Sequence, residues 1–269
     1  MKKKGFVTLL LVLLSLSLLT ACGVFQEVEA PSATLEAIPL ETQAAGVATT
    51  AVEPTTAPAE ATTAPAEATT APETTTAPEP TVETPTEAPT GTAQVFTIDS
   101  TASQVRFQLD EELRGEPKTV VGSTDQVAGQ LSLNLADLSQ TQVGIIQINA
   151  RTLATDNDFR NRAINNEILN TGEFEFITFT PTGIEGLPDS ATIGETITFT
   201  LVGDLTIRDI TQPATFTVEA TAVSETQVTG TATAVVNRTD FDLQIPSVPN
   251  VANVEEEVEL YIDFTANAS

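Results

Sequence analysis

Apolar and polar residues alternate along residues 196–218, and the second half of the chain is organised around this stretch. Ile197, Phe199 and Leu201 alternate with threonine-rich positions, and the alternation resumes after residues 208–213. A period of two with β-branched and aromatic side chains is typical of strands rather than helices. Residues 208–213 are polar and include a proline, which indicates a turn. The stretch therefore predicts an antiparallel strand pair with one apolar face.

Similar alternation predicts further strands on both sides of this pair, so that the total is about eight. In chain order they cover residues 95–98, 103–109, 126–135, 142–150, 174–180, 225–236 and 257–266. Acidic and glycine-containing stretches at residues 110–112 and 115–117 predict loops between the early strands.

One helix is expected among the strands. Thr155 can cap its start, and Phe159, Ala163 and Ile164 would form its apolar stripe. A long antiparallel sheet with one apolar face must fold over itself or close, and closure removes the exposed edges. We therefore predict an all-β fold with one or two short helices, built as an antiparallel barrel that has room for one ligand.

The chain begins with a pattern typical of an export signal. Three lysines precede an apolar run at residues 6–19, which is too short to span a bilayer comfortably and is followed by Thr20, Ala21 and Cys22. This pattern resembles a bacterial lipoprotein lipobox, in which the cysteine is acylated and becomes the first mature residue. We predict a signal peptide at residues 1–21 and acylation of Cys22, for example with palmitate. The alternative is an ordinary secretory peptide with an incidental cysteine.

Residues 22–93 differ in composition from the rest of the chain. The heptapeptide Thr-Thr-Ala-Pro-Ala-Glu-Ala occurs at residues 55–61 and again at 62–68. Such sequence cannot bury enough apolar surface to offset its chain entropy, and proline favours extended geometry. We predict a disordered linker that acts as a semi-stiff tether, either bare or glycosylated. One folded domain, residues 94–269, follows it.

Composition narrows the functional classes. The formal net charge is −26, and the chain has no histidine and one cysteine. Strong acidity argues against nucleic acid as a partner, and one cysteine excludes an internal disulfide or a cysteine-based metal cluster. Without histidine, an enzyme would need carboxylate or serine–lysine chemistry. Two aspartate pairs, Asp156 with Asp158 and Asp240 with Asp242, are explained more simply by cap and turn roles. We predict a binding protein, with no catalytic or metal site.

Several blocks of sequence, taken in order, resemble those of the YceI-like domain family across residues 94–266. They are Phe96-Thr97-Ile98-Asp99, Ser103-Gln104-Val105-Arg106-Phe107, Val127-Ala128-Gly129-Gln130-Leu131, the segment 153–161, Phe176-Ile177-Thr178-Phe179, Gly203-Asp204-Leu205-Thr206-Ile207 and the segment 237–243. The chain departs from the family at Phe96, where a tryptophan is common, at Ala102, often a histidine, and at Phe174-Glu175, where the family has Tyr-Pro. These departures bear on head-group recognition more than on the barrel.

The resemblance implies a lipocalin-like antiparallel barrel around an elongated apolar tunnel. Members of the family are secreted or periplasmic and are associated with polyisoprenoids or isoprenoid quinones. The predicted tunnel wall combines the apolar faces of the strands. It consists of Leu131, Leu133, Ile146, Ile148, Ile177, Phe179, Ile197, Phe199, Leu201, Leu260, Ile262 and Phe264.

Together these features predict a binding or carrier protein of the cell envelope. It would hold a polyisoprenoid lipid or isoprenoid quinone and no other cofactor, and it would be anchored on the extracytoplasmic side of a membrane through Cys22. The alternative is a surface or adhesion-type β-domain on a stalk, with a filled core and no ligand.

Overall fold

The structure, a computed structural model, describes residues 27–32, 35–40 and 91–269. The predicted signal peptide, Cys22 and the heptapeptide repeats lie outside the described residues. Within those ranges, no helix is both long and apolar enough to cross a bilayer.

The described residues form one antiparallel sheet of thirteen strands. The strands are β1 (Gln94–Ile98), β2 (Gln104–Leu113), β3 (Glu116–Thr124), β4 (Val127–Ala128), β5 (Gln130–Leu133), β6 (Gln142–Val143), β7 (Ile146–Asn149), β8 (Phe176–Glu185), β9 (Thr196–Ile207), β10 (Ile210–Ser224), β11 (Gln227–Asn237), β12 (Val251–Ala252) and β13 (Glu257–Ala268).

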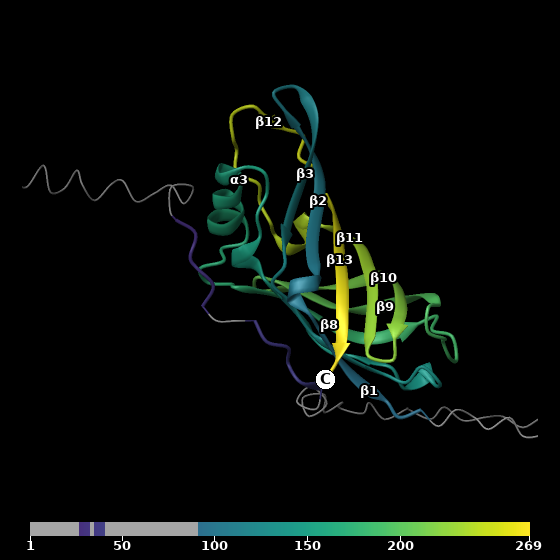
Figure 1. Cartoon of the computed structure of the whole chain (residues 1–269). Coiled ribbons are helices and arrows are strands. Elements are labelled where there is room, and N and C mark those ends of the chain that lie inside the picture. Colours follow the sequence, from purple (N-terminus) through teal and green to yellow (C-terminus); the bar gives the residue numbers. More distant parts are fainter. Residues whose placement is uncertain (1–26, 33–34, 41–90) are drawn as a thin grey trace, which may run out of the picture.

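The sheet is strongly curled, as in a barrel (Figure 1). The order is β4-β7-β8-β9-β10-β11-β13-β1-β5-β6. Gly129 alone separates β4 from β5, yet β4 pairs with β7 while β5 pairs with β1. The backbone N–H of Ile98 donates to the carbonyl oxygen of Gly129 at 3.0 Å across this junction. The prediction of an antiparallel lipocalin-like barrel is confirmed, with short strands where the predicted longer ones break.

The central hairpin is tighter than predicted. β9 and β10 pair from Ile207 with Ile210 to Thr196 with Thr221, so the turn is Arg208-Asp209 and not residues 208–213. Arg208 has a φ of 58°, in the left-handed region. Proline is tolerated at residue 213 because β11 pairs with β10 only from Thr217 onward, so among the described strands Pro213 has β9 alone beside it.

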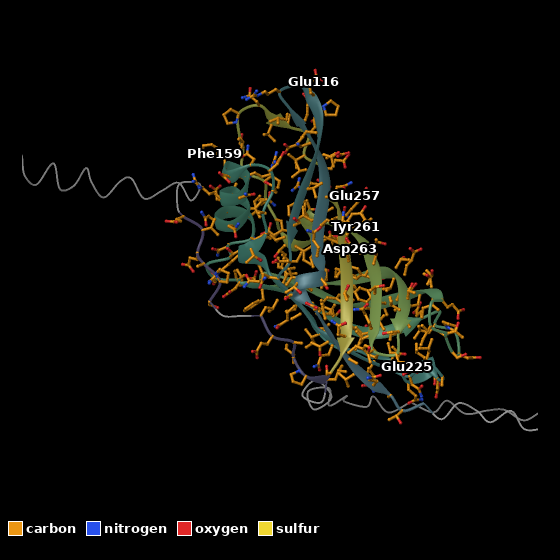
Figure 2. The ribbon with its side chains drawn as sticks, in the orientation of Figure 1. Glu116, Phe159, Glu225, Glu257, Tyr261 and Asp263 are labelled. Carbon is orange, nitrogen blue, oxygen red and sulfur yellow. The ribbon has the colours of Figure 1, made fainter. Side chains whose placement is uncertain are left out.

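The prediction of a loop at residues 110–112 is wrong, and in the loop predicted at residues 115–117 only Gly115 lies in a turn. β2 continues to Leu113 and pairs with β3, which begins at Glu116, so that the pair extends as an arm beyond the sheet (Figures 1 and 2). Arg114 and Gly115 form the turn with φ of 59° and 84°. The alternation survives through the acidic residues because Glu111 faces inward, where a cation on the helix pairs with its charge. The apparent loop signal therefore came from a buried carboxylate.

The predicted helix is present, but its details differ. It consists of α3 (Asp158–Ala163) followed by a π-helical turn, η6 (Ile164–Ile168). The cap is Asn157 rather than Thr155, because the Asn157 side-chain oxygen accepts from the N–H groups of Phe159 and Arg160 at 2.9 and 3.1 Å. Ala163 and Ile164 are buried, whereas Phe159 is 63% exposed, so the prediction of an apolar stripe through Phe159 is wrong.

The interior of the barrel is apolar. The rings of Phe179 on β8 and Phe216 on β10 meet edge to face, with centroids 4.9 Å apart. Both side chains are almost fully buried, and Leu205 on β9 is buried beside them. These three residues lie about midway along the barrel and divide its interior.

Part of the predicted tether contacts the barrel. We call residues 27–32 and 35–40 the N-terminal strap; it runs along the barrel as the purple trace in Figure 1. Residues 29–32 interact with Arg151 and Glu175, and Leu40 donates its N–H to the side chain of Gln130 at 3.3 Å. These residues, which the sequence assigns to the tether, therefore contact the barrel.

Candidate lipid-binding cavities

Two apolar cavities lie inside the barrel. The larger, which we call the upper cavity, has a volume of about 480 Å³ and lies beneath α3, η6 and the loop at residues 243–254. The smaller, the lower cavity, has a volume of about 100 Å³ and lies between β5, β6, the first half of β9, the second half of β10 and the first half of β11. Ligand pockets usually have volumes of about 300–1,000 Å³, so the upper cavity falls in that range and the lower one does not.

Side chains from many strands form the wall of the upper cavity. Phe107 and Leu109 on β2, Ile207 at the end of β9 and Leu260 on β13 supply apolar surface from the sheet. Ala163 on α3 closes the opposite side. The polar residues in this wall are Glu111, Asn157, Arg160 and Arg238. An apolar hollow with few polar groups is the usual form of a site for a small lipophilic ligand.

Glu111 and Arg160 form an ion pair in the wall of the upper cavity. Arg160 Nη2 lies 2.7 Å from Glu111 Oε1, and Glu111 is 8% exposed. Arg160 Nη1 lies 2.6 Å from Asp156, which also pairs with Lys118 Nζ at 2.9 Å. The hydrogen bond from Lys118, aided by the charges of Lys118 and Arg160 and opposed by desolvation, holds the pKa of Asp156 below its usual value. The formal charges of these four groups sum to zero.

Arg238 has a structural role in the same wall. Its guanidinium donates to the carbonyl oxygens of Leu243, Glu255 and Val254 at 3.0, 3.0 and 3.5 Å. These bonds fasten both ends of the loop at residues 243–254 over the cavity. The charge of Arg238 is therefore satisfied by the backbone.

The lower cavity has an almost wholly apolar wall. Thr141 Oγ1 is buried in it and finds no hydrogen-bond partner among the described residues. Glu195 also contributes to the wall, but its carboxylate accepts from the N–H and hydroxyl of Thr192, which hold the pKa of Glu195 below its usual value. Glu195 thus stabilises its own turn.

The twelve predicted tunnel residues all belong to the barrel, but most surround the smaller cavity. Those in the wall of the lower cavity are Leu131, Leu133, Ile146, Phe179, Ile197, Phe199, Leu201, Ile262 and Phe264. Ile177 and Leu260 line the upper cavity, and Ile148 is buried but belongs to neither wall. Their contact with a ligand stays a prediction.

The structure contains two hollows where the family resemblance implied one elongated tunnel. None of the described wall residues is shared between the two cavities. Along β9 the wall passes from Leu201 in the lower cavity to Ile207 in the upper one, and Leu205 between them lines neither. The layer that contains Phe179 and Phe216 therefore separates the two spaces.

Most of the residues that line the upper cavity were not predicted from the sequence. Glu111 is flanked at spacing two by Leu109 and Leu113, so continued alternation through the acidic residues was a signal that it faces inward. The loop at residues 243–254 carries an apolar residue at every second or third position between Leu243 and Val251, which is typical of a loop that covers an apolar surface. Arg160 had no comparable signal, because its partner lies on a strand 49 residues away.

The two aspartate pairs have local structural roles. Asp156 is held by Lys118 and Arg160, and Asp158 is in the first turn of α3. Asp240 lies in the 3-10 helix η7 (Arg238–Phe241), and Asp242 ends it with a φ of 50°. Cap and turn roles account for these four residues.

Comparison with known proteins identifies the family. The family model described as YceI-like domain matches residues 96–266. The UPF0312 protein SAB2563 of Staphylococcus aureus is 31% identical over 155 residues, which cover 55% of this chain and 81% of that protein. The UPF0312 protein SAS2572, from another strain of the same species, is 31% identical over 158 residues with the same coverage.

Two solved structures share the fold. A polyisoprenoid binding domain from Saccharophagus degradans, implicated in plant cell wall breakdown, superimposes with a TM-score of 0.52 at 14% identity, over 65% of this chain and 99% of that one. BcnA of Burkholderia cenocepacia gives a TM-score of 0.50 at 17% identity, over 63% of this chain and 99% of that one. The matched region, the barrel and the order of the sequence blocks agree, and the chain belongs to the YceI-like domain family.

Proposed function

We propose that this protein binds a neutral isoprenoid lipid, either a polyprenol or an isoprenoid quinone, in the upper cavity. The observation that carries the proposal is the apolar space of about 480 Å³ beneath α3, with an ion pair in its wall. The solved polyisoprenoid binding domain of similar fold supports the choice of ligand class. The lower cavity is about a fifth of that volume and is filled more simply by small movements of its wall.

The apolar wall suits an isoprenoid tail, which offers methyl groups and no hydrogen bonds. Burying about fifteen carbons, three isoprene units, contributes about 12 kcal/mol relative to water. An association cost of about 4 kcal/mol leaves about 8 kcal/mol, which corresponds to micromolar affinity. A bilayer is as apolar as the cavity, so transfer from membrane to protein is close to neutral. These energies favour a protein that carries the lipid and exchanges it with the membrane over one that holds it tightly.

The polar groups in the wall favour a neutral head group. Arg160 can donate to a quinone carbonyl, and Glu111 can accept from a prenol hydroxyl. A phosphate would meet the Glu111 carboxylate beside Arg160, in a group of four charges that sum to zero. The net charge of −26 also repels anions at long range. A prenyl phosphate is therefore expected to bind more weakly than the matching prenol.

We further propose that the protein works at the extracytoplasmic face of a membrane, attached through acylated Cys22. The basic head, apolar run and cysteine at the start of the chain support this location. A membrane anchor would keep the barrel beside its supply of lipid.

Lipid extraction tests which lipid the protein binds, and a pair of cavity-filling variants tests which cavity holds that lipid. Protein purified from its own host is expected to release an isoprenoid detectable by mass spectrometry, and delipidated protein should take up added quinone or prenol. Ala163→Phe places a ring in the upper cavity and should abolish uptake, because the tail loses its space. The matched variant Ala222→Phe, in the lower cavity, should retain it.

Melting curves of both variants control for folding. Equal uptake by the two folded variants would contradict the assignment to the upper cavity. Protein that carries no lipid from its host and takes up none would leave the alternative, a surface β-domain without a ligand.

A further inference from the structure

An ion pair joins the start of the N-terminal strap to a residue far from it in the sequence. Glu29 Oε2 lies 3.1 Å from Arg151 Nη2, and Arg151 Nη1 donates to the carbonyl oxygen of Ala30 at 3.1 Å. The same guanidinium donates to the carbonyl oxygens of Thr171 and Gly172 at 2.8 and 3.1 Å. Thr171 and Gly172 follow η6 closely in the chain, so the start of the strap lies beside the helical segment that covers the upper cavity.

Ser32 completes the attachment. Its N–H donates to Glu175 Oε1 at 2.8 Å, and its hydroxyl donates to Glu175 Oε2. The side chain of Glu175 is 10% exposed and also pairs with Arg151 at 3.2 Å and accepts from Asn149 at 2.9 Å. A buried carboxylate that receives several charge-assisted hydrogen bonds is a strong anchor point. Two of these bonds come from the strap.

Both ends of the segment that holds the heptapeptide repeats are tied to the same part of the barrel. Before it, Leu40 bonds to Gln130, the first residue of β5. After it, Asn134, the residue that follows β5, donates its side-chain N–H to the carbonyl oxygen of Gly91 at 2.6 Å. Four residues of strand span about 13 Å. Leu40 and Gly91 therefore lie against the barrel within a short distance of each other.

We propose that the strap fixes the barrel against the membrane with its α3 side facing the lipid. The proposal rests on acylation of Cys22, which is part of the proposed function. Cys22 is seven residues before Glu29, a reach of at most about 25 Å. An acylated Cys22 would therefore be held near the η6 side of the barrel, however long the repeat segment is.

The α3 side also presents apolar surface to such a membrane. Among the described residues, Phe159 on α3 is the most exposed large apolar side chain, and Figure 2 shows it on the outer side of the helix. Val248, in the loop that covers the upper cavity, is exposed as well. Both residues contribute to the wall of the upper cavity. The strap would therefore place the rim of the upper cavity at the bilayer. An isoprenoid could then pass directly between the bilayer and the cavity.

Acid should release the strap. Desolvation acts to raise the pKa of Glu175, but hydrogen bonds from Ser32 and Asn149 and the charge of Arg151 hold that pKa below its usual value. The charged groups that face this site are Arg151 and Glu29. Because the folded pKa is lowered, the stabilisation is complete above the ordinary glutamate pKa of about 4.3 and is lost as the pH falls through the lowered value.

The backbone amide signal of Ser32 in NMR spectra measures this release. It should stay constant from neutral pH to about 5 and shift in the acid range as Glu175 is protonated. The N–H of Ala136 is a control, because it donates to the neutral side chain of Asn134 at 3.0 Å. A Ser32 signal that moves no more than that of Ala136 would show that the strap is not held by Glu175.

Single tryptophans test the orientation, because the chain contains none. The full acylated chain, carrying either Phe159→Trp or Val235→Trp, is attached to vesicles of brominated phosphatidylcholine, which quenches tryptophan at the bilayer. Val235 is the matched control, an exposed apolar side chain on the outer face of β11. We expect Phe159→Trp to lose at least half of its fluorescence and Val235→Trp to lose little. Equal quenching of the two would overturn the proposal.

Two changes to the chain separate the strap from the repeats. Adding Glu29→Ala and Ser32→Ala should restore the fluorescence of the Phe159→Trp protein, while deleting residues 55–68 should leave its quenching unchanged. If deletion of the repeats raises the quenching, the repeat segment is a spacer and the proposal fails. Flotation of the vesicles measures whether the protein is attached to the membrane, and quinone uptake in detergent measures whether it binds its ligand. Failure of either part of the proposed function is thereby distinguished from failure of the strap.

Discussion

Replacing Phe179 with alanine is expected to lower the free energy of unfolding by about 4 kcal/mol, because a buried ring is removed and its neighbours fill the space only in part. Phe179 is 2% exposed, and its ring meets that of Phe216 edge to face at 4.9 Å. The ring also lies against the backbone of Gly203, where a Cβ would approach its tip to 2.7 Å. A layer packed this closely has little freedom to collapse. Chemical denaturation measures the change.

Phe159→Ala is the matched control for this variant. It makes the same change at an exposed side chain, so we expect it to alter the unfolding free energy by less than about 0.5 kcal/mol. Phe179→Ala should also open the layer between the two cavities, and a longer isoprenoid should then bind better relative to a short one. A loss of stability below about 1 kcal/mol would mean that the central layer is loosely packed and does not divide the barrel.

Replacing Arg160 with leucine is expected to cost about 3 kcal/mol, because it leaves the carboxylate of Glu111 in an apolar wall without its counter-ion. The two atoms of the pair lie 2.7 Å apart, and the side chains are 18% and 7% exposed. The double variant Arg160→Leu with Glu111→Leu should recover most of the stability, since apolar replacements of a buried pair are often neutral. The double variant should nevertheless discriminate less between a prenol and the matching hydrocarbon.

Arg106→Leu provides the comparison for a surface pair. Arg106 lies 2.7 Å from Asp263 on β13, but both side chains are about a third or more exposed, so the expected cost is below about 1 kcal/mol. Equal costs for Arg106→Leu and Arg160→Leu would show that Glu111 is solvated and would weaken its assignment to the cavity wall. Thermal and chemical denaturation of the three variants measures these costs.

The strands and their inward faces could be predicted because the signal is local. Ile197, Phe199 and Leu201 stand at spacing two, and the structure places all three on the inner side of β9. The predictions of a turn at Pro213 and of a loop at the acidic residues 110–112 are wrong, because whether a strand can hold such residues depends on what lies beside them. Among the described strands Pro213 has only β9 beside it, and Glu111 pairs with Arg160. The local sequence pattern gives no information about either of these neighbours.

An all-β domain with one apolar face, the YceI-like family and the order of the elements could all be predicted from residue patterns. The position of the internal space could not, because it depends on the packing of distant segments. Whether apolar side chains meet or leave a cavity depends on how β8, β9 and β10 are registered and on what α3 and the loop at residues 243–254 cover. The strap likewise depends on Ser32 meeting Glu175, 143 residues away. Alternation within a strand is set by backbone geometry, whereas such contacts arise from the packing of the whole chain, which no short stretch specifies.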